Sequence, residues 1–187
     1  FLSVSGGLQD AYTYISRGKV FANAQTGNIV LMSGYFFDGD FHKGLHYLIE
    51  AFKDVATDKK LCIVGGTSHS GEYVEQVVKM AEDDPRIMFL GFQQGAALEE
   101  LLSNAYLYVL PSDVEPISLL EAMSYGNCCV VSNIVENADV VEDKGVTFEK
   151  SNVKSLEKEL KNLLEDERIV NMLKAESREF ITMKYNW

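Results

Sequence analysis

The feature that most constrains the fold is a regular alternation of short apolar runs and amphipathic stretches over residues 41–187. Glycine, proline, asparagine or aspartate bounds each run, as expected of buried parallel strands: Leu61–Val64, Ile87–Leu90, Leu107–Leu110, Cys129–Ser132 and Val146–Phe148. Between the runs, apolar residues recur at helical spacing. This alternation indicates βαβ units, so we expect an α/β fold with a Rossmann-like, doubly wound parallel sheet.

One strand is missing from this pattern, before the helix that begins near Gly44. The run Asn28–Ser33 can supply it, and we expect Ile29–Met32 to form an edge or inner strand. In an open α/β sheet, ligands bind where strands end and helices begin. The connections to inspect are therefore 33–43, 65–71, 91–95, 111–117 and 133–137.

Composition excludes several classes of function. The 187 residues carry 17 basic and 28 acidic side chains, a net charge of −11, which disfavours nucleic-acid binding. The 3 cysteines form no C-x-x-C pair, which is typical of reduced thiols in a cytoplasmic protein. His42 and His46 lack a third ligand, so we expect no metal, and no cofactor either. The uncharged run Phe21–Phe37 is too polar in its first half for a membrane span, although membrane contact stays an alternative.

The connection 111–117 is the most informative part of the sequence. Pro116 suits the first position of a helix, whose free amides then point toward a bound phosphate. These amides belong to Ile117, Ser118 and Leu119. Glu121, in the second turn, can accept two hydrogen bonds from a ribose diol. On spacing alone, a capping role for Glu115 and simple solvation of Glu121 explain the same residues.

Two other segments carry weaker signals. Lys43 precedes Gly44 at the start of a helix and can reach a diphosphate, although most such lysines are only solvated. The run Gly65–Gly71 lacks the lysine of a phosphate loop, because Glu72 follows its last glycine, and it lacks G-x-G-x-x-G as well. We interpret it as a tight turn.

Residues from about 43 to 187 resemble the C-terminal, nucleotide-sugar-binding half of a GT-B glycosyltransferase of the large retaining family four. The similar stretches are KGLHYLIEAF (43–52), LCIVGG (61–66), RIMFLGF (86–92), AYLYVLPSDVEPISLLEAMSYGNCCVVSNIVEN (105–137) and YNW (185–187). The resemblance implies that Lys43 binds the donor diphosphate and that Glu121 holds the ribose. It also implies that Gly91 and Phe92 lie against the base, and that Glu115 lies near the donor sugar.

Three departures from the family pattern bear on activity. Five residues separate Glu115 from Glu121, where the family has seven, whereas Asp113 has the family spacing and can stand in for Glu115. Asp38 replaces the arginine that usually precedes the lysine by five residues. The family's N-terminal acceptor domain is not recognisable, and the sequence ends at Trp187, before the family's closing helix.

Residues 1 to about 48 resemble a different family, an uncharacterised group of bacterial multi-span membrane proteins, through the ANAQTGN segment at 22–28. We therefore expect a chimera, with a foreign appendage over 1–27 and the Rossmann-like domain over 28–187. An unusual extension on a transferase fragment is the alternative.

Together these patterns predict the donor-binding half of a retaining glycosyltransferase of the hexosyltransferase type. Its expected partner is a UDP- or GDP-sugar, with the acceptor domain missing or supplied by another chain, and we expect no turnover by this chain alone. The alternative is a non-catalytic module or chimeric fragment with a degraded donor site, associated with the inner membrane face through its N-terminus.

Overall fold

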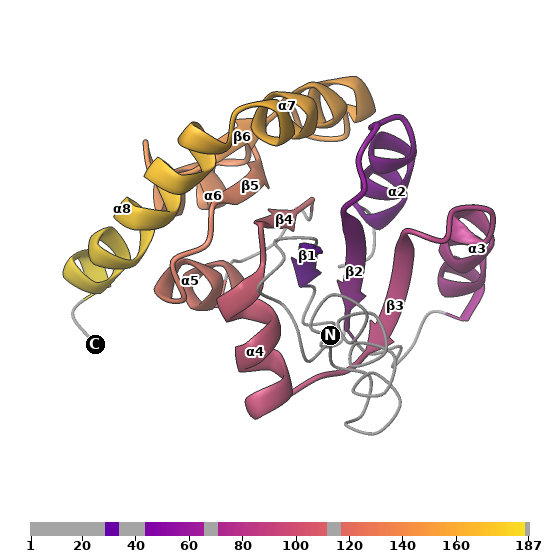
Figure 1. Ribbon diagram of the computed structural model, residues 1–187, viewed down its shortest axis with the longest axis horizontal. Coiled ribbons are helices and arrows are strands. Elements are labelled where there is room, and N and C mark those ends of the chain that lie inside the picture. Colours follow the sequence, from indigo (N-terminus) through magenta and orange to yellow (C-terminus); the bar gives the residue numbers. More distant parts are fainter. Residues whose placement is uncertain (1–28, 34–43, 66–70, 112–116, 186–187) are drawn as a thin grey trace, which may run out of the picture.

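A computed structural model describes residues 29–33, 44–65, 71–111 and 117–185 of the chain (Figure 1). Its strands are Ile29–Ser33 (β1), Lys60–Val64 (β2), Ile87–Gly91 (β3), Leu107–Leu110 (β4), Cys129–Ser132 (β5) and Val146–Phe148 (β6). Its helices are Leu45–Lys53 (α2), Gly71–Ala81 (α3), Ala96–Asn104 (α4), Ile117–Ser124 (α5), Val135–Val141 (α6), Val153–Glu165 (α7) and Glu167–Tyr185 (α8). Every strand that the sequence predicts is present, within one residue at either end.

All six strands are parallel and follow the order β3-β2-β1-β4-β5-β6. The run that the sequence offered as an edge or inner strand is an inner one. Val30 of β1 is in register with Leu61 of β2 on one side and with Leu107 of β4 on the other. This order confirms the predicted α/β, doubly wound sheet.

The two faces of the sheet carry separate apolar cores because successive strand residues point to opposite sides. Leu107 and Val109 of β4 belong to one core, together with buried residues of α2, α3 and α7. Tyr108 and Leu110 belong to the other core, with α4, α5 and α6. Helix α8 contributes to both, and Figure 1 shows it running from α7 toward α5. The strands are therefore covered on both faces, which explains their continuous apolar runs.

Helix α6 was missed by the sequence reasoning, which placed a connection over 133–137. The helix begins at Val135 and buries Asn137, Val140 and Val141. Asn137 interrupts the apolar stripe, so hydrophobic periodicity alone does not reveal this helix. Its side-chain amide donates to the hydroxyl of Ser132 at 3.0 Å, which ties α6 to the end of β5.

The three cysteines are free and buried, as the sequence predicted. Burial raises the pKa of Cys62 and of Cys128 to about 12, so both thiols stay protonated. Within the described ranges, no helix combines the length and the hydropathy of a bilayer-spanning segment. Residues 1–28, which include the predicted appendage, lie outside the described part of the chain.

Candidate functional site

The strand order reverses between β1 and β4, and this marks the candidate site. From β1 the chain passes through α2 to β2 on one side, and from β4 it passes through α5 to β5 on the other. The chain therefore leaves β1 and β4 toward opposite sides of the strand order, and in open α/β sheets ligands bind at such a switch point. Lys43 precedes α2 and Glu115 precedes α5, so both predicted binding segments belong to this switch point.

Gly44 joins the two sides of the switch point. A Cβ atom built on Gly44 would lie 2.2 Å from the carbonyl oxygen of Pro111 and 2.6 Å from its carbonyl carbon. Because the clash is with backbone atoms, only glycine lets the start of α2 approach the end of β4 this closely. The two residues are 67 positions apart in the sequence, so no local sequence pattern predicts their contact.

The N-terminus of α5 carries the three residues predicted to present amides to a phosphate. Ile117 is 78% exposed, whereas Ser118 and Leu119 are buried beneath it and anchor the first turn. Neither α5 nor α2 has an acidic residue in its first turn. The positive ends of both helix dipoles are therefore not neutralised by first-turn acids, and both lie at the switch point.

Glu121 is half-buried in the second turn of α5. Its backbone carbonyl accepts a hydrogen bond from the Ser124 hydroxyl at 2.7 Å, but no described residue makes a hydrogen bond or ion pair with its carboxylate. Burial raises the pKa of the nearby Tyr125, and the charges of Glu99 and Glu121 raise it further. Glu121 lies in the second turn of α5 as predicted, and its role toward a ligand stays a prediction.

Gly91 and Phe92 lie at the carboxyl end of β3, on the same edge of the sheet. Gly91 has φ = +67°, a conformation that favours glycine, and its carbonyl accepts from the amide of Gly65 at 2.9 Å. Phe92 follows with 51% of its surface exposed. One strand separates β3 from β1, so this corner is about 10 Å from β1 across the sheet.

The other predicted site residues are not described by the structure. Lys43, Asp113 and Glu115 fall in the ranges 34–43 and 112–116, and their side-chain roles stay predictions. Among the described residues, no group of three or more histidine, cysteine, aspartate or glutamate side chains could hold a metal ion.

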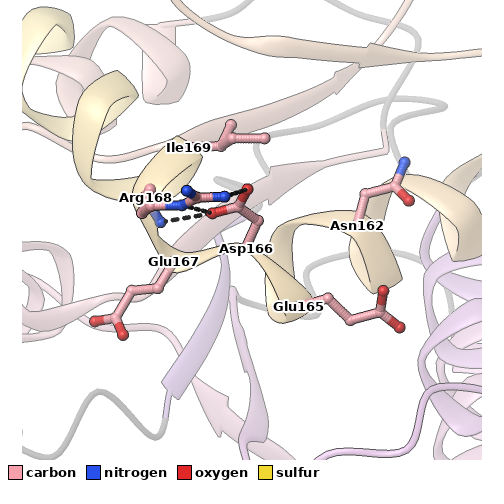
Figure 2. A pocket seen from close by; sticks show the side chains of 6 residues that line it. All are labelled: Asn162, Glu165, Asp166, Glu167, Arg168 and Ile169. Carbon is pink, nitrogen blue, oxygen red and sulfur yellow. Dashed lines mark hydrogen bonds and ion pairs between the residues drawn. The ribbon is translucent and has the colours of Figure 1, made fainter.

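A polar hollow of about 590 Å³ lies at the junction of α7 and α8 (Figure 2). It is lined by Asn162, Glu165, Asp166, Glu167, Arg168 and Ile169. Helix α7 starts near the carboxyl end of β6 and runs for 13 residues, about 20 Å, so this junction lies near the opposite edge of the sheet. Among the described residues, the only cationic side chain that lines the hollow, Arg168, donates two hydrogen bonds of 3.0 Å to the carboxylate of Asp166. With this cation already paired, the hollow is not suited to bind phosphate.

Comparison with known proteins fits this arrangement. Residues 18–180 match the family described as Glycosyl transferases group 1. An uncharacterized glycosyltransferase of Methanocaldococcus jannaschii is 30% identical over 156 residues, which are 79% of this chain and 39% of that protein. The match begins before residue 28, where the sequence predicts a boundary, and that boundary stays a prediction.

Solved structures share the fold. Sucrose-phosphate synthase from Thermosynechococcus elongatus aligns with a TM-score of 0.76 and 24% identity, covering 90% of this chain and 45% of that one. HepE from Anabaena, solved with UDP and glucose, aligns with a TM-score of 0.78 and 16% identity, covering 95% of this chain and 48% of that one. The chain thus spans less than half the length of each of these proteins, and its fold is that of one half of a GT-B glycosyltransferase.

Proposed function

The chain belongs to the glycosyl transferases group 1 family, and from this premise we propose that its switch point binds a nucleotide-diphospho-sugar, a UDP- or GDP-sugar. The observation that carries the proposal is the contact of Gly44 with Pro111, which brings the start of α2 against the carboxyl end of β4, the strand that precedes α5. Neither helix has an acid in its first turn, and we propose that their two N-termini form one anion-binding site.

The diphosphate lies between these two helices in our proposal. The amides of Ile117, Ser118 and Leu119 face it from α5, and Lys43 approaches it from the segment before α2. Backbone amides and one lysine suffice to hold two phosphates locally, although the chain carries a net charge of −11.

The nucleoside extends from the diphosphate along the carboxyl edge. Glu121 accepts hydrogen bonds from the two ribose hydroxyls, because its half-buried carboxylate has no partner among the described residues. Gly91 and Phe92 lie against the base at the carboxyl end of β3. In this proposal the nucleoside extends over the carboxyl end of β2, along the distance of about 10 Å that separates β1 from β3 across the sheet.

The reaction that we propose is transfer of a sugar with retention of its anomeric configuration. As the bond to the sugar breaks, negative charge builds up on the departing diphosphate, where the helix N-termini and Lys43 stabilise it. Glu115 or Asp113 lies beside the donor sugar. The shortened spacing from Glu115 to Glu121 moves this acid relative to α5, and a misplacement of about 1 Å can cost about 100-fold in rate.

Turnover also requires an acceptor-binding half, in the same polypeptide or in another chain. Holding donor and acceptor in reacting geometry can remove about 7–11 kcal/mol from a barrier. The 187 residues here supply one wall of such a cleft. We therefore propose that they bind donor but do not transfer sugar by themselves.

Calorimetry with UDP, GDP and UMP tests the proposal. We expect UDP or GDP to bind at least tenfold more tightly than UMP, since only a diphosphate places a second phosphate in the anion-binding site. Glu121→Ala should weaken binding by about 10-fold or more, the value of one hydrogen-bonded charge. The matched control is Glu99→Ala in the first turn of α4, which should bind as the unchanged chain does. Equal affinity for UDP and UMP, or equal losses in both variants, would refute the site.

Two further proposals concern the N-terminal segment and the compartment. The resemblance of residues 1–48 to a membrane-protein family is the reason for proposing a chimeric origin. Sequencing the genomic locus across codons 35–50 tests this origin, since an interrupted reading frame there would show an artefact.

The three free, buried cysteines support a cytoplasmic location, which cell fractionation would check.

A further inference from the structure

A tyrosine of α3 crosses to the start of α2. The hydroxyl oxygen of Tyr73 accepts a hydrogen bond from the backbone amide of His46 at 3.3 Å and lies 3.0 Å from Nδ1 of the same residue. The two rings meet edge to face with centroids 5.9 Å apart. The ring of Tyr47 also contacts the imidazole, with centroids 3.9 Å apart, so the imidazole packs against two aromatic side chains.

This contact supplies the cap that α2 lacks in its own sequence. The N-cap residue is Gly44, which has no side chain to accept from the free amides of the first turn. Tyr73, 27 positions further along the chain, provides an acceptor from a neighbouring helix. Gly44 is pressed against Pro111 on one side and the first turn is bonded to Tyr73 on another, so two separate elements fix this helix end.

The phenol caps α2 without cancelling its dipole. Burial raises the pKa of Tyr73, and the amides of His46 and Leu45 only partly offset this, so the hydroxyl keeps its proton. With Nδ1 unprotonated, the hydroxyl can donate to the imidazole while its oxygen accepts from the amide. A carboxylate cap would neutralise the positive helix end, whereas a neutral hydroxyl leaves it for a ligand's negative charge.

We propose that Tyr73 is a positioning residue for donor binding, which acts through the backbone amide of His46 to hold the start of α2 in the geometry that receives the diphosphate. This proposal rests on the function proposed above. Without the hydroxyl, the first turn frays, the competent arrangement is populated for a smaller fraction of the time, and the apparent affinity falls by that fraction.

The test compares Tyr73→Phe with Tyr106→Phe, two variants that each lose one hydroxyl bonded to the backbone. The hydroxyl of Tyr106 donates to the carbonyl of Leu163 in α7 at 3.1 Å, on the helix that leads away from the switch point. Both variants should lose similar stability. Only Tyr73→Phe should weaken UDP binding, by about three- to tenfold, the range for one lost hydrogen bond.

Two measurements separate this role from a purely structural one. Amide hydrogen exchange at His46 should accelerate in Tyr73→Phe and stay unchanged in Tyr106→Phe. His46→Asn, which keeps an acceptor near the position of Nδ1, should retain most of the UDP affinity. His46→Leu keeps the capped backbone amide but loses the side-chain contact, so it should lose less UDP affinity than Tyr73→Phe.

Each outcome of these measurements tests a different part of the proposal. An unchanged rate of amide hydrogen exchange at His46 in Tyr73→Phe would show that Tyr73 does not cap α2, whether or not nucleotide binds. Faster exchange with unchanged or tighter UDP binding would overturn the positioning role, since tighter binding means that the hydroxyl competes with phosphate. If the unchanged chain binds neither UDP nor GDP, the proposed function fails, and the positioning role fails with it.

Discussion

Helices α2 and α5 differ from α3, α4 and α6, although all five follow strands of the same parallel sheet and start at its carboxyl edge. The latter three each carry an acid in the first turn, Glu72, Glu99 and Glu136 respectively, and the former two carry none. Such an acid stabilises a helix by about 0.3–1 kcal/mol. Helix α7, after β6, also lacks a first-turn acid, but the side chain of Asn152 caps it. Helices α2 and α5 flank the switch point, and the proposed function assigns their positive ends to a ligand.

The largest expected effect comes from crowding the junction between these two helices. Gly44→Ala places a Cβ against the backbone of Pro111, so we expect the free energy of unfolding to fall by about 3 kcal/mol and UDP binding to be lost. Ala96→Ser, at the exposed start of α4, adds an atom where there is room and should change stability by less than about 0.5 kcal/mol. Urea unfolding of both variants measures the difference, and equal stabilities would show that Gly44 is not needed for close approach.

A middle-sized effect should follow from giving α5 the acid that it lacks. Ile117→Glu replaces an exposed side chain, so the fold should persist, while a carboxylate beside the diphosphate should weaken UDP binding by about tenfold. Val135→Glu makes the same change at the first residue of α6, where Val135 is 70% exposed. Calorimetry should find UDP binding unaffected there. Similar losses in both variants would mean that general charge repulsion, and not the local helix end, governs affinity.

The smallest expected effect is the reverse change at α6. Glu136→Gln removes an exposed first-turn carboxylate, which should lower the free energy of unfolding by about 0.3–1 kcal/mol at low ionic strength. UDP affinity should stay as it was. Thermal unfolding at low and high salt measures this, because screening should erase the difference. A loss that persists in high salt would point to packing instead of the helix dipole.

Hydrophobic pattern alone located the strands, because both faces of this sheet are covered and each strand is a continuous apolar run. Leu107–Leu110 and Cys129–Ser132 were predicted with the bounds that the structure shows. Helix α6 was not predicted because one of its buried residues, Asn137, is polar, and the search for helical spacing considered only apolar residues.

The site was predictable in part, for a related reason. The segments at Gly44 and Ile117 were recognised from strand-to-helix transitions, which are local. The contact of Gly44 with Pro111 and the bond from His46 to Tyr73 join residues 67 and 27 positions apart, and only the assembled sheet brings them together. Lys43, Asp113 and Glu115 lie outside the described residues, so their roles continue to rest on sequence.

The central place of β1 has a consequence for synthesis on the ribosome. Ile29–Ser33 leaves the ribosome before the other described strands of the sheet, yet its neighbours are Lys60–Val64 and Leu107–Leu110. At about 5–20 residues per second, roughly 4–16 seconds pass between the translation of β1 and that of β4. During that time β1 has at most one partner, and the sheet cannot close around it. The nascent chain therefore holds an unpaired strand edge at β1, the position that the finished sheet encloses between β2 and β4.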